Sequence, residues 1–155
     1  MKELMSSSQR ISGISGIAAS RLVTVGTNAL LVNVAKQLTR SQVSLVVVCN
    51  PDGAMAGVIT KSDLIRQMAS CPASACQTVA SDIMTRDVTF CYDTDKLEDV
   101  LLTLQTQGLV HLPLIASNHK PVGVVNARDA LRSLLKQEQY DESLLRNYVM
   151  GVGYQ

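Results

Sequence analysis

The stretch Gly57-Val58-Ile59-Thr60-Lys61-Ser62-Asp63 marks a junction at which an apolar strand, expected over 55–59, runs into a helix. Thr60 and Asp63 have the spacing of a capping box, in which a hydroxyl and a carboxylate bond the free N–H groups of a first helical turn. Such a helix start also carries partial positive charge and can hold an anion. A carboxylate beside a bound phosphate can accept hydrogen bonds from ribose hydroxyls. Taken alone, the pattern favours a purely structural cap.

The chain repeats this stretch as Gly123-Val124-Val125-Asn126-Ala127-Arg128-Asp129, at an offset of 66 residues (123 − 57). The same offset aligns Leu31, Val34 and Leu38 with Leu97, Val100 and Leu104, Val46 and Val48 with Leu112 and Leu114, Asp63 and Arg66 with Asp129 and Arg132, and Ser15 and Ile17 with Ser81 and Ile83. Two copies of one supersecondary unit explain this alignment. Two copies favour a closed pair, because an open solenoid needs several repeats to bury a core.

Composition excludes several classes of partner. The 155 residues suffice for one domain with a real core, and 46% of them are hydrophobic. The formal net charge of +1 gives no overall field to attract nucleic acid or an anionic membrane. With no Trp and a single Phe, Phe90, the chain also lacks an aromatic platform for stacking single-stranded bases. We therefore expect neither nucleic acid nor a membrane as a partner.

The N-terminal residues lack the apolar core of a signal peptide, and the longest apolar run, 45–49, is too short to span a bilayer. A cytoplasmic location with reduced thiols is therefore expected. Cys49 and Cys91 fall in predicted strands and read as small core residues. Cys71 and Cys76 form a C-x4-C pair, for which a zinc site is the alternative. No second ligand pair lies nearby, so no metal is expected.

Each copy reads as strand–helix–strand–strand–helix, an α+β fold of the α/β type. The first copy is expected to have an extended arm over 12–20, strands over 22–25, 43–49 and 55–59, and helices over 28–38 and 62–69. The second has an arm at 82–85, strands over 88–91, 110–115 and 121–125, and helices over 94–107, ended by Gly108, and 127–139. Met55, Met68 and Met84 read as core residues, and His119 as a solvated turn residue.

The expected organisation is a flexible N-terminus (1–11), a first repeat (12–70), a linker (71–80), a second repeat (81–139) and a C-terminal helix with a tail (140–155). The last helix carries an apolar stripe of Leu144, Leu145, Tyr148 and Val149. This stripe could close the core or form a contact surface, and we favour a contact across a homodimer.

Two copies in this order, each ending in G-h-h-[T/N]-x-x-D, resemble a tandem pair of cystathionine-β-synthase (CBS) domains over residues 12–137. The segment 81–88, with Asp82-Ile83-Met84-Thr85, is similar to that family's D-I-M-T segment before the first strand. Leu112-Pro113-Leu114-Ile115, a turn and Gly123-Val124-Val125 are similar to its second and third strands. The resemblance implies two three-stranded sheets packed as a pseudo-twofold pair, with two clefts between them.

In many members of that family the clefts bind adenosine ligands: AMP, ADP, ATP, NAD or S-adenosylmethionine. Carried over by resemblance, Thr60 meets a phosphate and Asp63 the ribose hydroxyls of one site, and Asn126 and Asp129 take those places in the other. Residues around Leu22, Val23 and Thr24, and around Val88, Thr89 and Phe90, line the adenine pockets, and Lys61, His111 and Arg128 neutralise phosphate charge.

The sequence departs from the family pattern at two places. Residues 15–19 stand where the second copy has its D-I-M-T segment, so the first arm is degenerate. Asn126 replaces a hydroxyl residue, although an amide can still cap a helix or donate to a phosphate. The first site thus matches the family's junction motif more closely, and the second site matches the family's D-I-M-T segment more closely. Apart from its candidate role, His111 fits a satisfied, partly buried side chain, and Arg66 and Arg132 fit surface charges.

No catalytic arrangement is recognisable, because no Ser or Cys stands beside a His in a known motif and no G-x-x-x-x-G-K-[S/T] loop is present. The sequence therefore predicts a regulatory module rather than an enzyme. It binds an adenine nucleotide between its repeats, most simply AMP, ADP or ATP as in energy sensing, and changes its shape or its affinity for an unknown protein partner. The alternative is a dimeric interaction scaffold whose clefts are empty.

Overall fold

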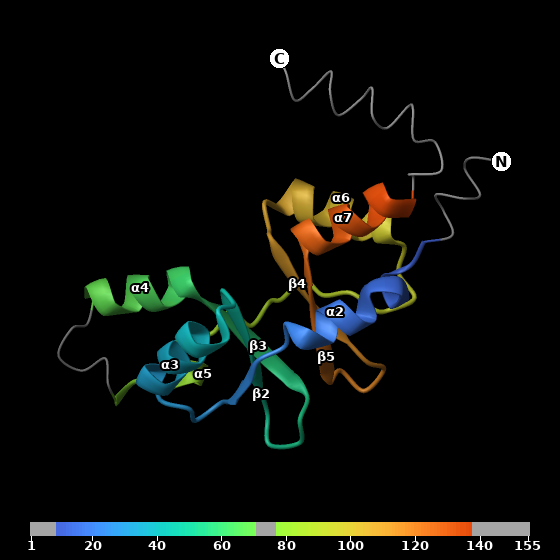
Figure 1. Cartoon of the computed structure of the whole chain (residues 1–155). Helices are drawn as coiled ribbons and strands as arrows, with labels where there is room; N and C mark the ends of the chain where they lie inside the picture. Colours follow the sequence, from blue (N-terminus) through green and yellow to red (C-terminus); the bar gives the residue numbers. More distant parts are fainter. Residues whose placement is uncertain (1–8, 71–76, 138–155) are drawn as a thin grey trace, which may run out of the picture.

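The computed structural model describes residues 9–70 and 77–137 and shows two halves, each a small sheet with its own helices (Figure 1). Three expectations lie outside the described residues: the loose first residues, the Cys71 and Cys76 pair, and the C-terminal helix with its apolar stripe.

The first half contains seven elements: η1 (Ile11–Ile14), α2 (Ser15–Ser20), β1 (Thr24–Gly26), α3 (Leu31–Ser41), β2 (Leu45–Cys49), β3 (Met55–Thr60) and α4 (Lys61–Ser70). Its sheet has the order β1-β2-β3, with β1 parallel and β3 antiparallel to the central strand β2. Residues 45–48 of β2 are all buried, which explains the nearly continuous apolar run at this place in the sequence.

The second half contains α5 (Ala80–Ile83), α6 (Leu97–Gln107), β4 (His111–Ile115), β5 (Pro121–Asn126) and α7 (Ala127–Gln137). The internal repeat is confirmed by strand register, because Leu45 pairs with Thr60 in the first sheet and His111 with Asn126 in the second. Each hairpin also has its irregularity at the equivalent place, after Val48 and after Leu114. Gly108 ends α6 in the left-handed conformation, as predicted.

The prediction of a strand over 88–91, and with it a second three-stranded sheet, is wrong. The second sheet has two strands, and Cys91 adds only an isolated parallel bridge to Leu114. Proline supplies the reason. In the first half, the N–H of Val47 donates to the carbonyl of Val23 at 2.9 Å, but the equivalent residue in the second half is Pro113, which has no N–H.

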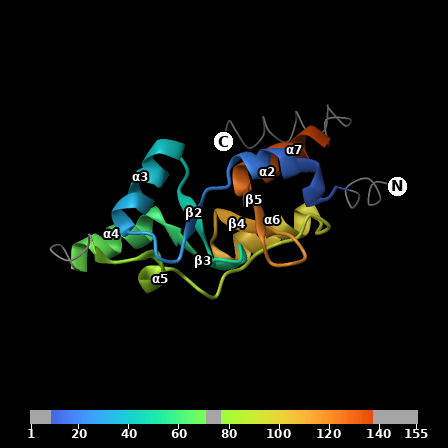
Figure 2. The same ribbon diagram turned by 90° about the horizontal axis from the view of Figure 1, so that it is seen from below.

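The arm over 12–20 is helical rather than extended, and it lies on the other half of the molecule. Figures 1 and 2 show α2 beside β5, and the two elements pack against each other. The segment before the second repeat does the reverse, since α5 packs against β3. Each half therefore receives its cover from the other half of the chain.

The arms correspond at a different offset from the rest of the repeat. The N–H of Ile11 donates to Asp95, and the N–H of Ala80 donates to Ala29, at 2.9 and 2.8 Å. Asp95 and Ala29 are 66 residues apart, but Ala80 and Ile11 are 69 residues apart (80 − 11). The first arm thus carries three extra residues, and the alignment of Ser15 with Ser81 is wrong.

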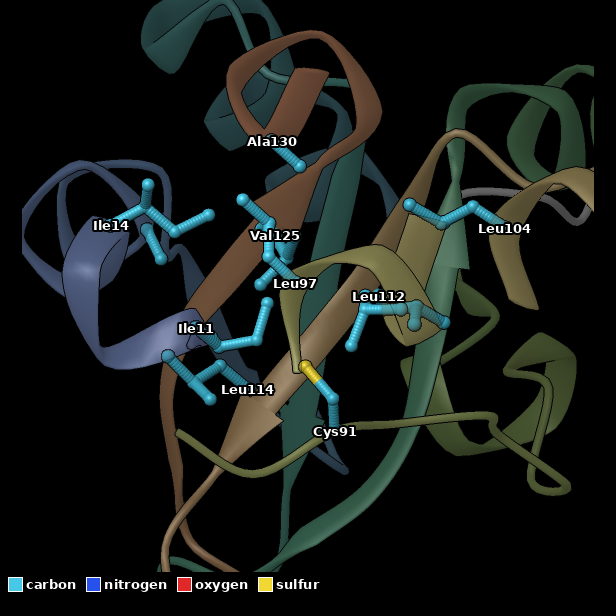
Figure 3. Packing of buried hydrophobic residues seen from close by; sticks show 11 residues of the cluster. Ile11, Ile14, Cys91, Leu97, Leu104, Leu112, Leu114, Val125 and Ala130 are labelled. Carbon is cyan, nitrogen blue, oxygen red and sulfur yellow. The ribbon is translucent and has the colours of Figure 1, made fainter. Parts of the chain in front are cut away.

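Buried side chains form one cluster in each half and a third between the halves. Figure 3 shows the cluster of the second half, in which Ile11 and Ile14 of the first arm join Leu97, Leu114 and Val125. The third cluster joins Leu45, Val47, Met55 and Val58 of the first half to Ile115 and Val124 of the second.

Two of the three methionines predicted for the core are buried there, Met55 and Met84. Met68 is 62% exposed on α4, so its assignment to the core is wrong. The helical spacing that suggested a buried position places Met68 on the outer side of a helix that buries Leu64.

Candidate functional site

The first junction, defined as residues 57–63 between β3 and α4, forms the predicted capping box. The N–H of Thr60 donates to Asp63 Oδ2 at 2.9 Å, and the N–H of Asp63 donates to Thr60 Oγ1 at 3.2 Å. The other carboxylate oxygen, Oδ1, accepts from the guanidinium of the exposed Arg66 at 3.2 Å. The side chain of Asp63 is 16% exposed. Because each carboxylate oxygen has two lone pairs, Asp63 retains capacity to accept further hydrogen bonds.

Lys61 is the first residue of α4 and is exposed next to this capping box. Thr60 is half-buried. The junction therefore places a hydroxyl, a carboxylate and an exposed ammonium at one helix start. The backbone N–H groups of that helix start add partial positive charge.

The second junction, defined as residues 123–129 between β5 and α7, does not form the same box. Asn126 Oδ1 accepts from the N–H of Arg128 at 2.7 Å, two residues on rather than three. Arg128 itself is exposed near the start of α7. An amide thus caps this helix start by an Asx-type turn, and it leaves Asp129 available for another partner.

That partner is Arg21, which follows α2 at the end of the first arm. The three extra residues lie before this point, because Gly123 faces Ala18 where Gly57 faces Met84, so the offset of 66 applies to Arg21. Its Nη2 donates to Asp129 Oδ1 at 2.8 Å, and its Nε donates to Oδ2. The Asp129 side chain is only 2% exposed and that of Arg21 is 39% exposed, while Arg132 Nη1 lies 3.8 Å from Oδ1. The hydrogen bonds that Arg21 donates to Asp129, together with the negative charge of that carboxylate, raise the pKa of Arg21 against the opposing effect of burial. A buried carboxylate is therefore neutralised by a fork of two parallel bonds.

His111, the first residue of β4, lies beside this ion pair. Its Nε2 is 3.2 Å from Asn126 Nδ2 and 3.3 Å from Ser44 Oγ. Because Asn126 Oδ1 already accepts from a backbone N–H, its amide nitrogen faces the ring, so Nε2 accepts and the imidazole is neutral with its proton on Nδ1. Burial lowers the pKa of His111, and the positive charge of Arg21 lowers it further, against an opposing effect of Asp129. His111 is thus a satisfied, partly buried side chain.

The residues proposed to line adenine pockets lie around β1 in the first repeat and in the equivalent segment, 88–90, of the second. Val23 packs half-buried against the core cluster of the first half, and Thr24 is exposed in β1. Val88 and Phe90 pack half-buried against the cluster between the halves, and Thr89 donates to Gln107 Oε1 at 2.8 Å.

His119 departs from its expected place in water. It is half-buried with a positive φ of 65°, and its ring meets Phe90 edge-on at 5.2 Å between centroids. On its other contact, Phe90 meets Tyr92 edge-on at 5.6 Å. The turn that holds His119 also reaches the first half, because its carbonyl accepts from the N–H of Met55 at 2.9 Å.

The structure thus brings Asn126, Asp129 and His111 together around Arg21 and Ser44, which the sequence did not single out. Arg21 stands 108 residues from Asp129, and no local motif connects them. The one available signal is a charge reversal, because Arg21 stands where the second repeat has Asp87 at the offset of 66.

The described residues contain no group of three or more His, Cys, Asp and Glu side chains placed to hold a metal ion. Within 9–70 and 77–137, no helix has the length and apolarity that crossing a membrane requires. Burial raises the pKa of the Cys91 thiol to about 12, with a smaller contribution from Asp95, so this thiol stays protonated in the core.

Comparison with protein-family models matches the CBS domain twice, over residues 14–70 and 80–136. An uncharacterized 17.7 kDa protein of Acidianus ambivalens is 29% identical over 125 residues, which are 79% of this chain and 73% of that protein. Homoserine O-acetyltransferase of Methanosarcina acetivorans is 27% identical over 74% of this chain, but the match spans only 20% of the enzyme.

Among solved structures, the CBS-domain containing protein ATU1752 from Agrobacterium tumefaciens has a TM-score of 0.71 at 22% identity, covering 81% of this chain and 98% of that one. The CBS domain pair of protein MJ0100, solved in complex with 5′-methylthioadenosine and S-adenosyl-L-methionine, has a TM-score of 0.67 at 20% identity, covering 77% and 96%. CBS-pair proteins are generally regulatory, non-catalytic modules that bind ligands. The chain belongs to the CBS domain family and carries two copies of the domain in tandem.

Proposed function

We propose that this protein is a regulatory module that binds an adenosine-containing nucleotide at the first junction. Asp63 accepts the ribose hydroxyls, and Thr60, Lys61 and the start of α4 hold the phosphate. One observation carries the proposal: the Asp63 carboxylate is fixed by its bond from Thr60, yet it remains partly exposed with lone pairs to spare. A hydroxyl donor can therefore bind without first breaking the cap.

The ligand class is supported by the MJ0100 pair, whose solved complex contains two adenosine compounds. AMP, ADP and ATP come first for the present chain because Lys61 offers an unburied positive charge beside the helix start. NAD and S-adenosylmethionine share the adenosine part and remain in the same class. The bases pack near β1, against Val23 and Thr24, or near the equivalent segment of the second repeat, against Val88, Thr89 and Phe90.

A second binding position is proposed at the second junction, with Asp129 for the ribose and Asn126, Arg128 and His111 near the phosphate. Its carboxylate is less accessible than that of Asp63, because Arg21 already bonds both oxygens. Regulation then follows if the ligand binds one conformation of the protein more tightly than another. A ligand with equal affinity for both would leave the equilibrium between the conformations unchanged. The molecule that responds to this change is a protein partner or a second copy of the chain.

Thermal unfolding with AMP, ADP, ATP, NAD and S-adenosylmethionine tests the proposal. A ligand present at a hundred times its dissociation constant adds about 2.7 kcal/mol to the free energy of unfolding. Asp63→Asn keeps an acceptor for the Thr60 N–H but removes the charge that receives the ribose. It should reduce the ligand-induced rise in the midpoint more than Asp129→Asn does.

Asp95→Asn is the matched control. Asp95 Oδ2 accepts from the N–H of Tyr92 at 2.8 Å, the same three-residue bond that Asp63 makes, but outside both junctions. This variant makes the same change of charge in a comparable cap and should keep the full ligand response. If none of the five compounds raises the midpoint of the unaltered protein, the nucleotide function is wrong.

The alternative of a dimeric scaffold is favoured by one observation. Ile65 on α4 and Leu131 on α7 are 67% and 49% exposed, and they occupy equivalent positions of the two repeats. Exposed apolar side chains at both positions suit a contact with a second copy. Sedimentation of the protein with and without nucleotide separates the two functions: a scaffold with no ligand shows a dimer that AMP or ATP leaves unchanged.

A further inference from the structure

The two junctions differ in the charge that reaches their carboxylates from the opposite repeat. At the second junction, Arg21 of the first arm bonds both oxygens of Asp129. At the first junction, the residue equivalent to Arg21 is the exposed acid Asp87, which cannot form an ion pair with Asp63. Within the described residues, the ion pair of Asp63 is with Arg66 of its own helix. The two junctions are thus equivalent in their backbone, but the corresponding residues of the opposite repeat carry opposite charges.

This difference sets different demands on a ligand. Ribose hydroxyls can bond Asp129 only if the guanidinium of Arg21 gives way, because the carboxylate side chain is 2% exposed and both its oxygens are engaged. A neutral nucleoside takes the carboxylate and leaves Arg21 without an acceptor of comparable strength. A phosphate restores what Arg21 loses, since a guanidinium bonds two phosphate oxygens as it does two carboxylate oxygens.

Other positive charge near Asp129 is consistent with a phosphate. Arg128 is exposed near the start of α7, and Arg132 Nη1 lies 3.8 Å from Asp129 Oδ1. His111 does not add to this charge, because its ring nitrogen accepts a hydrogen bond and its pKa is lowered. With Arg21 turned from Asp129 to the ligand, three guanidinium groups lie around one helix start.

We propose that Arg21 is a specificity-determining residue, which makes the second junction admit phosphorylated adenosine compounds and reject neutral adenosine. The inference rests on the proposed function and adds that the two junctions accept different ligands. The first junction binds adenosine with or without a phosphate, because no ion pair between the repeats must open there. The second binds only a ligand that exchanges partners with the Arg21–Asp129 pair.

Calorimetric titration of the Asp63→Asn variant with adenosine and with AMP measures the second junction in isolation. AMP should bind at least about tenfold more tightly than adenosine, the equivalent of one charge-assisted hydrogen bond. Adding Arg21→Gln should bring the two affinities to within about threefold of each other, because no guanidinium then needs a phosphate. The matched control Arg10→Gln removes an exposed guanidinium that donates to the carbonyl of Thr94 at 3.0 Å, outside both junctions, and should preserve the preference.

A second measurement needs no change at Arg21. In the Asp63→Asn variant, the nitrogen-15 NMR signal of Arg21 Nε–H should shift on saturation with AMP and stay in place with adenosine. A signal that AMP does not move overturns the inference, as does a preference for AMP that survives Arg21→Gln.

The outcomes also separate this inference from the proposed function. If the unaltered protein binds adenosine and AMP but Asp63→Asn binds neither, the second junction takes no ligand. The inference and the second binding position then fail, while the proposed function at the first junction stands. If Asp63→Asn binds both equally, the inference fails alone. If the unaltered protein binds neither compound, nor any other member of the class, both fail together.

Discussion

Asp63 and Asp129 occupy equivalent places in the two repeats, but water reaches them differently. Asp63 is 16% exposed beside its own cap, whereas Asp129 is buried under Arg21. A local motif is sufficient to predict the first arrangement, because a capping box needs only residues three apart. The second depends on a partner 108 residues away, which only the folded chain brings near. Two junctions that share a sequence motif therefore need not form the same site.

His111 provides a pH-dependent readout of this neighbourhood. Burial and Arg21 lower its pKa from the ordinary value of 6.5 in the folded protein. As the pH falls below 6.5, the unfolded chain therefore binds a proton before the folded protein does. The contribution of His111 to the free energy of unfolding is complete above that pH and is lost as the pH falls through the folded value.

We expect the unaltered protein to lose more stability than His111→Gln between pH 7.5 and pH 5.5. Glutamine keeps a polar side chain at the position but does not titrate, so it removes this component and leaves every other group in place. Urea unfolding of both proteins at each pH measures the difference. Parallel losses would contradict the assigned neutral state of the ring.

At the scale of elements, the sequence predicts well wherever local chemistry is decisive. The apolar run at 45–49 predicts β2, the strand expected over 55–59 is β3, and Gly108 predicts the end of α6. The arm was mispredicted because its small residues have no helical periodicity, and packing on β5 decides its conformation. The missing strand at 88–91 was readable only by comparing Pro113 with Val47 across the repeat.

The crossing of the arm over β5 requires a glycine. A Cβ on Gly123 would lie 2.9 Å from both the backbone carbon and the side chain of Ala18, so helix and strand would have to separate. Gly123→Ala should therefore lower the free energy of unfolding by about 1–3 kcal/mol. Denaturant unfolding measures this loss.

Gly16→Ala, on the same arm, is the control. A Cβ on Gly16 would have no heavy atom within 4 Å, and the residue lies in α2. Alanine favours the helix there by about 0.5–1 kcal/mol, so this variant should be as stable as the parent or more stable. Equal losses in the two variants would show that Gly123 is not a site of close packing.

For the whole molecule, the exchange of arms makes the two halves interdependent. The core of the second half contains Ile11, Ile14 and Ala18 of the first arm, and these residues are all buried (Figure 3). The third cluster joins both sheets directly. Neither repeat buries its own apolar surface without the other, so the pair should unfold in a single cooperative transition.

A fragment of residues 77–155 should therefore remain unfolded on its own, because it lacks those three side chains. A synthetic peptide of residues 9–26 should restore its circular dichroism spectrum at stoichiometric concentration. The same peptide with Ile11 and Ile14 changed to serine should fail, since it presents no apolar cover. A fragment that folds without any peptide would show that the arm is dispensable.

The crossed arms also bear on ancestry. A single-repeat ancestor could have made these contacts only by exchanging arms with a second copy of itself. Its smallest folded form would then have been a dimer. Joining two such genes end to end would have preserved every contact and freed each copy to mutate separately. The acid at position 87 and the arginine at position 21 are what such separate change would leave, since equivalent places in the two repeats now carry opposite charge.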